Sequence, residues 1–258
     1  MSVPSPVFLT VRYTSARLPG KCLRKIGGLS VLEHLIRRLQ ITGLTPIICT
    51  STDLSDDIII DEANRLQVKY FRGSLLNKIQ RWSDCASKFG FSYAHILDAD
   101  DPFFDTEEVI ESIAQFQNLG IDLLKTSKRS DSGFASVGMS ISADFLSVLA
   151  MRTKKLASSD LDVIPWALIT SNLDKIRIKS DNVLINQEIE LRLTLDYPED
   201  LDLLDILAKK FGPLGKRIDI ENYLVDNVEL RKLNAHRTSD FLKNKSLSLE
   251  ENFGITRY

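Results

Sequence analysis

Short apolar runs alternate with segments of helical periodicity through the first half of the chain. Four runs rich in Val, Ile, Leu and Phe, each bounded by polar residues or glycine, predict buried strands. They cover residues 7–11, 46–50, 68–71 and 93–97. The segments that follow them repeat apolar residues with the helical period and predict helices at residues 30–43, 56–66, 75–89 and 106–116. This order predicts an α/β fold with a mixed, mostly parallel sheet and helices on both faces.

Capping signals mark several of these helix boundaries. Ser30 followed by Glu33 has the spacing of a capping box, and Gly43 is expected to end the same helix. Residues 72–74 are expected to break the pattern between the third strand and the third helix. Thr106 is expected to cap the fourth helix.

The second half of the chain is more mixed. Residues 122–127 and 135–141 favour strands, Ser142 favours a helix start, and residues 160–170 favour a further helix. Apolar and polar side chains alternate strictly over residues 189–195, which predicts a strand.

A helix is expected after that strand, because Pro198 suits a first helical turn and Gly212 suits a stop. From about residue 214 the chain is polar and is expected to be irregular, as a surface arm or a dimer contact. We therefore divide the chain into a main domain, residues 1–212, and a C-terminal extension, residues 213–258.

Composition and charge narrow the classes of function. The 258 residues carry a net charge of −2, so nothing global favours nucleic acid or an anionic membrane. The three cysteines are far apart and form no metal-binding pattern, which favours structural thiols in a reducing compartment. No apolar run approaches the roughly 20 residues of a membrane helix, and no signal peptide is recognised, so we expect a cytoplasmic protein.

A basic loop follows the first predicted strand. It gathers Arg12, Arg17 and Lys21, with Ser15 and Gly20 between them. Cations held close together need an anionic partner, and guanidinium, ammonium and loop N–H groups together suit a polyphosphate. The alternative is a solvated surface loop that is basic by chance.

An acidic cluster follows the fourth predicted strand, at Asp98, Asp100, Asp101 and Asp105. Such residues are often turn formers or helix caps, and Asp105 or Thr106 is expected to be one. Carboxylates this close also repel one another, which a divalent cation relieves, and Mg²⁺ binds one or two carboxylates together with phosphates and water.

The two clusters are expected to lie close together, because ligands of parallel sheets bind at the carboxyl ends of the strands. Carboxylates for a metal and cations for phosphates at one edge predict a nucleotide site. The chain contains neither GxxxxGK[ST] nor GxGxxG, which disfavours a P-loop ATPase and a dinucleotide-dependent oxidoreductase.

Four motifs in order resemble those of a known family. The run RYTSARLPGK at residues 12–21 resembles the R-x-x-S-x-R-L-P-G-K loop of the cytidylyltransferases that make CMP-activated sugars, of the CMP-Kdo synthetase and spore-coat polysaccharide type. FRGS at residues 71–74 is similar to the FRGS segment of the same family. DADDP at residues 98–102 is similar to T-G-D-x-P, and RLTLDYPED at residues 192–200 to R-L-T-V-D-x-P-E-D.

This resemblance implies a GT-A-like (Rossmann-like) three-layer α/β/α nucleotidyltransferase fold that binds CTP and Mg²⁺, with residues 1–212 as the cytidylyltransferase-like domain. It implies Asp100 and Asp196 as metal ligands, and Arg12, Lys21 and Asp100 as catalytic residues. The nucleotide-binding residues that it implies are Arg12, Ser15, Arg17, Lys21, Ser74, Asn77, Asp98 and Asp100. A homodimer is usual in the resembled family and is expected here.

The expected reaction transfers CMP from CTP to a sugar acid, a Kdo-, sialic- or related 2-keto-3-deoxy sugar, with release of pyrophosphate, for polysaccharide or lipopolysaccharide biosynthesis. Residues 135–139 and 158–160 depart from the family pattern where the acceptor binds, as do Asp98 and Ala99 in the acidic motif. The alternatives are a cytidylyl- or uridylyltransferase acting on a sugar phosphate or phosphonate, and a non-catalytic binding protein on the same fold.

Overall fold

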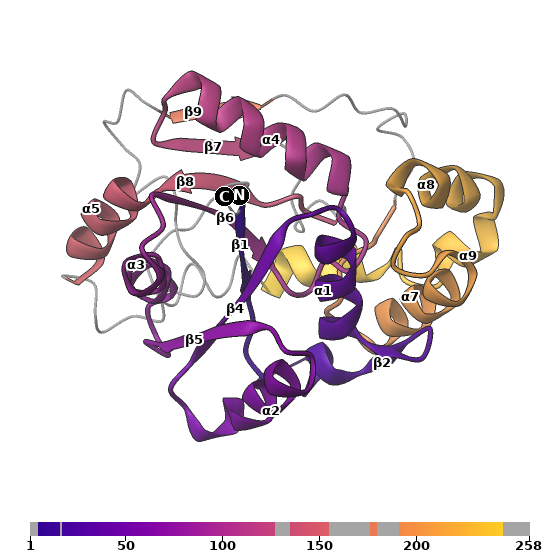
Figure 1. The fold of residues 1–258 in the computed structure, drawn as a ribbon. Helices are drawn as coiled ribbons and strands as arrows, with labels where there is room; N and C mark the ends of the chain where they lie inside the picture. The colour runs from indigo at the N-terminus through magenta and orange to yellow at the C-terminus, as the bar shows by residue number, and fades with distance from the viewer. Residues whose placement is uncertain (1–4, 16, 127–134, 155–175, 180–190, 245–258) are drawn as a thin grey trace.

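The computed structural model describes residues 5–15, 17–126, 135–154, 176–179 and 191–244. Within these ranges the chain forms a seven-stranded sheet in the order β5-β4-β1-β6-β8-β7-β9 (Figure 1). Helices cover both faces of this sheet, and its mixed, mostly parallel arrangement confirms the predicted α/β class. The expected helix at residues 160–170 lies outside the described residues.

Four parallel strands form the half of the sheet that carries the site. Their bounds are Pro6–Thr10 for β1, Thr45–Ser51 for β4, Lys69–Gly73 for β5 and Tyr93–Asp98 for β6. β1 lies between β4 and β6, with Thr10 opposite both Cys49 and Asp98. Because all four strands run the same way, their carboxyl ends meet at one edge of the sheet, as predicted.

The other half of the sheet contains shorter strands. β8 (Met139–Ser142) runs antiparallel to both β6 and β7 (Leu123–Thr126), and β9 (Ile176–Lys179) runs parallel to β7. The strand expected at 135–141 therefore begins later. Gly138, with φ of +76°, places its Cα so close to the Ile96 carbonyl that an added Cβ would lie 2.0 Å from that oxygen.

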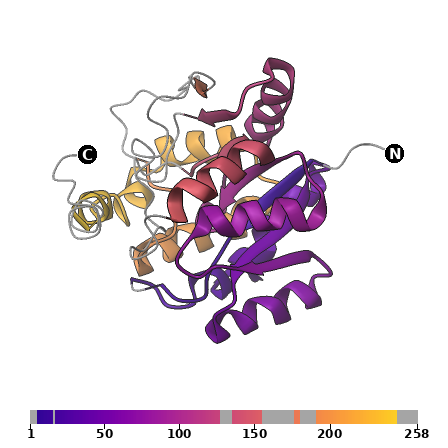
Figure 2. The same cartoon turned by 90° about the vertical axis from the view of Figure 1, so that its left-hand side faces the viewer.

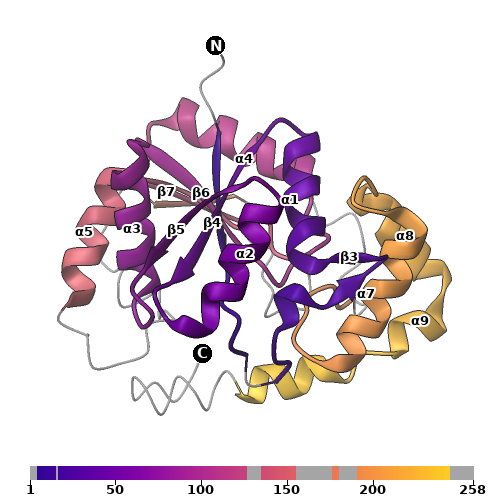
Figure 3. The same cartoon turned by 60° about the horizontal axis from the view of Figure 1, so that its bottom comes forward.

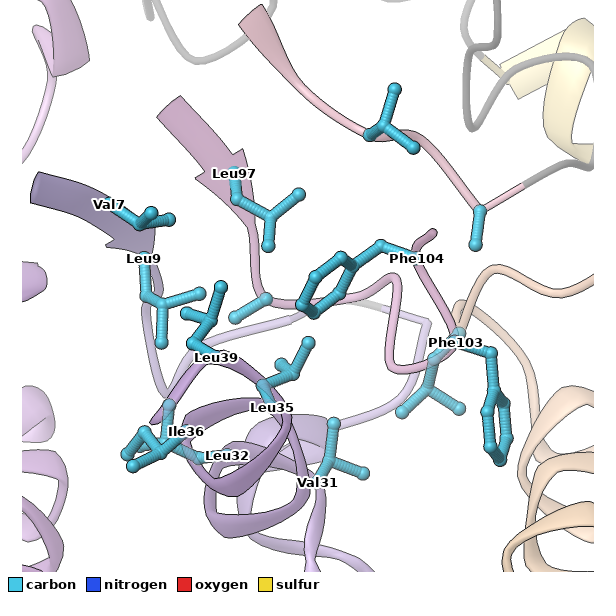
Figure 4. Close-up of a cluster of buried hydrophobic side chains, with 14 of the residues drawn as sticks. Val7, Leu9, Val31, Leu32, Leu35, Ile36, Leu39, Leu97, Phe103 and Phe104 are labelled. Atoms are coloured by element: carbon cyan, nitrogen blue, oxygen red, sulfur yellow. The ribbon is translucent and has the colours of Figure 1, made fainter. Parts of the chain in front are cut away.

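Alternation along β1 divides the core into two layers, because successive side chains point to opposite faces. Val7 and Leu9 join one cluster of buried side chains, and Phe8 joins the other. The first cluster takes in α1 (Val31–Ile41), α2 (Asp57–Arg65) and α4 (Thr106–Leu119), and Figure 4 shows the strand side chains packed against α1. The second takes in α3 (Lys78–Phe89) and α5 (Ala143–Thr153), which lie side by side in Figure 2.

Local capping explains where these helices begin, and it corrects some predicted boundaries. Ser30 caps α1 as predicted, accepting a hydrogen bond from the Glu33 amide at 3.0 Å. Asn77 caps α3, so that helix starts three residues later than predicted, and residues 72 and 73 belong to β5. Asp105, and not Thr106, caps α4, because its carboxylate accepts from two amides of the first turn.

The strand predicted at 189–195 is not formed over its described residues, 191–195. These residues are all buried, so both faces of the alternating pattern are covered. The segment lies against the loop after β6, where the Leu195 amide donates to the Asp100 carbonyl at 2.8 Å. α7 (Pro198–Phe211) then starts at Pro198, as predicted.

The tail expected to be irregular is helical. It forms α8 (Arg217–Asp226), α9 (Val228–Lys232) and a further helical stretch from residue 237. Ile220 and Leu224 are buried in the same core cluster as α1 and α7. Figure 3 shows α7, α8 and α9 gathered beside the small ribbon of β2 (Lys25–Ile26) and β3 (Leu29–Ser30). A division of the chain at residue 212 stays a prediction.

Candidate functional site

The loop after β1 is held by its own backbone and by one buried carboxylate. Gly20 adopts φ of +65° and donates its amide to the Tyr13 carbonyl at 3.1 Å, which closes the turn. Lys21 then begins a short 3₁₀ helix, η1 (Lys21–Leu23). The Tyr13 amide donates to Asp56 Oδ1 at 2.7 Å, which ties the loop to the turn after β4.

Asp56 is buried, and both of its carboxylate oxygens accept hydrogen bonds. Its Oδ2 accepts from the Thr50 hydroxyl at 2.9 Å and from the Ser51 amide at 3.1 Å, besides the bond from Tyr13 to Oδ1. A buried carboxylate needs such donors to offset its lost hydration. Asp56 therefore fixes the basic loop against strand β4.

Lys21 joins two carboxylates from distant parts of the chain. Its Nζ lies 3.0 Å from Asp100 Oδ2 and 3.1 Å from Asp196 Oδ1, and it donates to the Leu195 carbonyl at 2.8 Å. Arg17 Nη2 lies 2.6 Å from the same Asp196 Oδ1. The structure thus brings Arg17, Lys21, Asp100 and Asp196 together at the edge where the parallel strands end.

Mutual attraction sets the charge states in this cluster. Burial opposes the charged form of Lys21, but the carboxylates of Asp100 and Asp196 outweigh it and raise the pKa of Lys21 above its usual value. Burial likewise opposes ionisation of Asp196, but Lys21 and Arg17 outweigh it and hold the pKa of Asp196 below its usual value. Both groups are charged at neutral pH.

A second ion pair lies directly behind Asp196. Arg192 Nε donates to Asp200 Oδ1 at 2.7 Å, and Arg192 Nη2 donates to Asp200 Oδ2 at 2.9 Å. Asp200 Oδ2 also accepts from the amides of Asp196 and Tyr197, each at 2.9 Å. This bidentate pair fixes the backbone that carries the Asp196 carboxylate.

The carboxylate pair fits a magnesium ion. Asp100 Oδ1 is buried and has no hydrogen-bond partner among the described residues, so a polar oxygen there is left for a ligand. The described part of the chain holds no group of three or more His, Cys, Asp or Glu side chains arranged for a metal. Two carboxylates suit Mg²⁺ nonetheless, because it usually keeps several waters and takes its other ligands from substrate phosphates.

The other predicted nucleotide-binding residues lie along the same edge of the sheet. Arg12 lies two residues after the end of β1 and is half-buried, and Asp98 ends β6. Ser15 Oγ accepts from the Leu18 amide at 3.4 Å, inside the loop.

Ser74 and Asn77 lie after β5, at the far side of that edge. Ser74 Oγ accepts from the Asn77 amide at 3.1 Å, and Asn77 Nδ2 donates to the Thr153 hydroxyl on α5 at 3.0 Å. Their described hydrogen bonds thus serve a turn and the α3–α5 contact, not the cluster around Lys21.

Sequence reasoning missed two residues that shape the site. Asp56 carried only the general signal of a polar turn, and Asn234 lies in the tail that was expected to be irregular. The pairing of Arg192 with Asp200 has the i and i+8 spacing of an extended segment running into a helix, and only the fold reveals it.

The cysteines and the described helices show no second site. The three cysteines are free and buried, and Cys49 Sγ lies 3.3 Å from Cys85 Sγ inside the α3 layer. Among the described residues, every helix is too short or too polar to cross a membrane.

Comparisons with known proteins show which family the sequence matches. The cytidylyltransferase family model matches residues 7–143, which include the basic loop and Asp100. An uncharacterized protein of Methanocaldococcus jannaschii is 24% identical over 88% of this chain and 93% of its own length. A 3-deoxy-manno-octulosonate cytidylyltransferase of Colwellia psychrerythraea is 25% identical over 41% of this chain and 38% of its own length.

Solved structures show the same fold. A cytidylyltransferase from Leptospira borgpetersenii superposes with a TM-score of 0.72 at 20% identity, over 88% of this chain and 95% of that one. A CMP:2-keto-3-deoxy-manno-octonic acid synthetase complexed with CTP superposes with a TM-score of 0.59 at 15% identity, over 81% of this chain and 99% of that one. The fold is therefore the GT-A-like nucleotidyltransferase fold, and the family match covers more than half of the sequence. This chain belongs to the cytidylyltransferase family, whose members use CTP to transfer a cytidylyl group.

Proposed function

We propose that this protein transfers CMP from CTP to a sugar acid of the 2-keto-3-deoxy class, with Mg²⁺ as its cofactor and release of pyrophosphate, in the biosynthesis of a cell-surface polysaccharide. The observation that carries the proposal is the Lys21 ammonium group held between Asp100 and Asp196. The Colwellia relative, by its name a sugar-acid cytidylyltransferase, supports the acceptor class.

In this proposal the cations exchange partners when substrate enters. Without nucleotide, Lys21 and Arg17 neutralise Asp100 and Asp196. The triphosphate of CTP supplies competing anionic oxygens, and the Asp100 and Asp196 carboxylates would then be free to hold a metal ion, which would replace the lost positive charge. Arg12, Arg17 and Lys21 then bind phosphate oxygens, for which guanidinium and ammonium groups are well suited.

The chemical step is an in-line displacement. An acceptor hydroxyl oxygen forms a bond to the α-phosphorus, the bond from that phosphorus to the β-bridging oxygen breaks, and pyrophosphate leaves with the electron pair. The hydroxyl proton passes to solvent. The bound metal, held by Asp100 and Asp196, would neutralise phosphate charge and acidify the acceptor hydroxyl.

The protein's own contribution is positioning and charge. Lys21 and Arg12 stabilise the charge that develops on the leaving pyrophosphate, and such preorganised groups are typically the largest catalytic contribution. His34 and His95 are not available as bases, because each is buried and burial lowers its pKa, to about 3 for His34 and about 4 for His95.

An acceptor panel with pyrophosphate detection tests the proposal. CTP is offered with 2-keto-3-deoxy sugar acids, phosphorylated sugars or phosphonates, each with Mg²⁺ or with a chelator. We expect turnover with a sugar acid only, and only with the metal. Asp100→Asn should abolish it, whereas Asp105→Asn should not, because Asp105 caps α4 and an asparagine can do the same.

The other outcomes separate the alternatives. Turnover with a phosphorylated acceptor or a phosphonate, or with UTP in place of CTP, would replace the proposed acceptor or nucleotide. Binding of CTP without turnover on any acceptor would favour a non-catalytic binding protein. The proposed homodimer is tested separately, by the solution mass of the intact protein.

A further inference from the structure

Asn234 reaches the site from the C-terminal helices. It follows α9 and is fully buried, at 0% exposure. Its Nδ2 donates two hydrogen bonds, to the Arg192 carbonyl at 3.0 Å and to Asp200 Oδ1 at 2.8 Å. One amide group thus links the residue four positions before Asp196 to the residue four positions after it.

The linkage closes a ring of polar contacts around Asp196. Asp200 receives Arg192 on both oxygens and the amides of Asp196 and Tyr197 on Oδ2. Asn234 supplies the remaining described donor, on Oδ1. All of these side chains are almost completely buried, so the bonds are shielded from competition with water.

A second contact of the same segment supports this arrangement. Phe241, in the helical stretch after Asn234, places its ring 5.3 Å from the Arg17 guanidinium and 5.6 Å from the Arg192 guanidinium. Tyr197 lies at similar distances from both, at 5.6 and 5.5 Å. Arg17 Nη2 lies 2.6 Å from Asp196 Oδ1, and Arg192 Nη2 lies 3.5 Å from Asp196 Oδ2. The C-terminal segment therefore contacts both of these arginines, which are far apart in the sequence.

We propose that Asn234 is a positioning residue that holds the Asp196 carboxylate in the orientation needed to bind the metal–nucleotide complex, so that the C-terminal segment completes the site. This inference rests on the proposed metal-dependent use of CTP. Asn234 touches neither substrate nor metal and acts through Arg192 and Asp200. Groups that orient metal ligands in this way are typically worth about 10–100-fold in metal affinity or activity.

The test uses the full-length protein with Mn²⁺ and CTP, without acceptor, and measures bound Mn²⁺ by electron paramagnetic resonance. Asn234→Leu fills the volume and removes both donors, and Asn234→Ser keeps one donor if the leucine variant does not fold. The matched control is Asn227→Ala, because Asn227 lies in the same helical tail and donates to the Tyr223 carbonyl, away from the site. Near-ultraviolet circular dichroism and Tm establish that each variant is folded.

We expect the Asn234 variants to weaken Mn²⁺ binding by about tenfold or more, and Asn227→Ala to change it less than about twofold. In an Asp196→Asn background, the Asn234 substitution should weaken Mn²⁺ binding no further, because the carboxylate that Asn234 is proposed to orient is already gone. A folded Asn234 variant that binds Mn²⁺ as tightly as wild type, or effects that add fully to Asp196→Asn, would overturn the proposal.

The readout also separates this inference from the proposed function. Wild-type protein that binds Mn²⁺ and CTP but turns over no acceptor would refute the transfer reaction and leave the role of Asn234 intact. Wild-type protein that binds Mn²⁺ no better with CTP than without it would refute both.

Discussion

Replacement of Lys21 by methionine tests the central contact of the site. Methionine keeps most of the length of the side chain and removes its charge, so Asp100 and Asp196 lose the cation between them. Asp196 retains Arg17 at 2.6 Å and Arg192 at 3.5 Å, whereas Asp100 has no other described ion pair. The substitution therefore leaves one partly buried carboxylate uncompensated and the other under-compensated.

The structure bounds the cost of this change. Breaking a fully buried ion pair by removing one partner costs about 3–5 kcal/mol. Here the Lys21 side chain is 17% exposed and that of Asp100 25%, and Arg17 remains on Asp196, so we expect about 2–3 kcal/mol. For a chain of this size that corresponds to a fall in Tm of about 4–12 °C.

Magnesium should act differently on the two proteins. In wild type the ammonium group of Lys21 occupies the space between the carboxylates, so Mg²⁺ alone should raise Tm little. In Lys21→Met the ion can take that place, so Mg²⁺ should restore part of the lost stability. Turnover should nevertheless stay at least about a hundredfold below wild type, because the phosphate-binding cation is missing.

Differential scanning calorimetry with and without Mg²⁺ measures the first two effects, and pyrophosphate release measures the third. Lys209→Met is the matched control, because Lys209 pairs with Asp205 at an exposed surface and its loss should change stability by less than about 0.5 kcal/mol. An unchanged Tm, no extra response to Mg²⁺, or near-normal turnover of Lys21→Met would refute the assigned role of Lys21.

Three further predictions concern stability. Asp56→Asn should lower the free energy of unfolding measured in urea by about 1–3 kcal/mol and raise the KM for CTP, because it weakens the hydrogen bonds that hold the basic loop. An unchanged KM would contradict the anchoring role. Burial lowers the pKa of His95 to about 4, so the unfolded chain takes up a proton at higher pH than the folded protein, and the free energy of unfolding should fall by up to about 3 kcal/mol as pH drops from about 6.5 to about 4. His95→Gln should lose this pH dependence, and an equally steep fall in the variant would refute the assignment. Gly138→Ala should lower the free energy of unfolding by more than about 3 kcal/mol, because the added Cβ would lie 2.0 Å from the Ile96 carbonyl oxygen. Gly120→Ala has a similar φ but open space around its Cβ and should cost about 1 kcal/mol, so equal losses would contradict the close approach at Gly138.

The first half of the fold was predictable because its signals are local. Each buried strand is a short apolar run, and each helix carries an apolar stripe and a capping residue close by. The errors there are small shifts, such as the start of α3 at Lys78, where Asn77 offers a better cap than the residues before it. The parallel order also predicted that the loop after β1 and Asp100 would share one edge.

The second half was less predictable because its pattern admits two structures. The alternation over residues 191–196 indicates two distinct faces but does not say what covers them. A strand would place the polar face in water, whereas the structure buries it against Asp200 and the C-terminal segment. Asn234 makes its contacts 42 and 34 residues away, and no local signal marks such a pairing.

The ionic cluster itself argues for function over stability. Buried ion pairs lose much of their attraction to the cost of desolvation, and well-packed apolar residues often replace them with no loss of stability. Arg17 and Lys21 nevertheless converge on Asp196 across about 180 residues of chain, and Arg192, Asp200 and Asn234 lie behind it. A set of charges assembled from distant segments, with one buried carboxylate oxygen of Asp100 left without a described partner, is a poor device for holding a fold together. It is a suitable one for exchanging an ammonium group for a metal ion, and this is why the response of Lys21→Met to Mg²⁺ discriminates between the two roles.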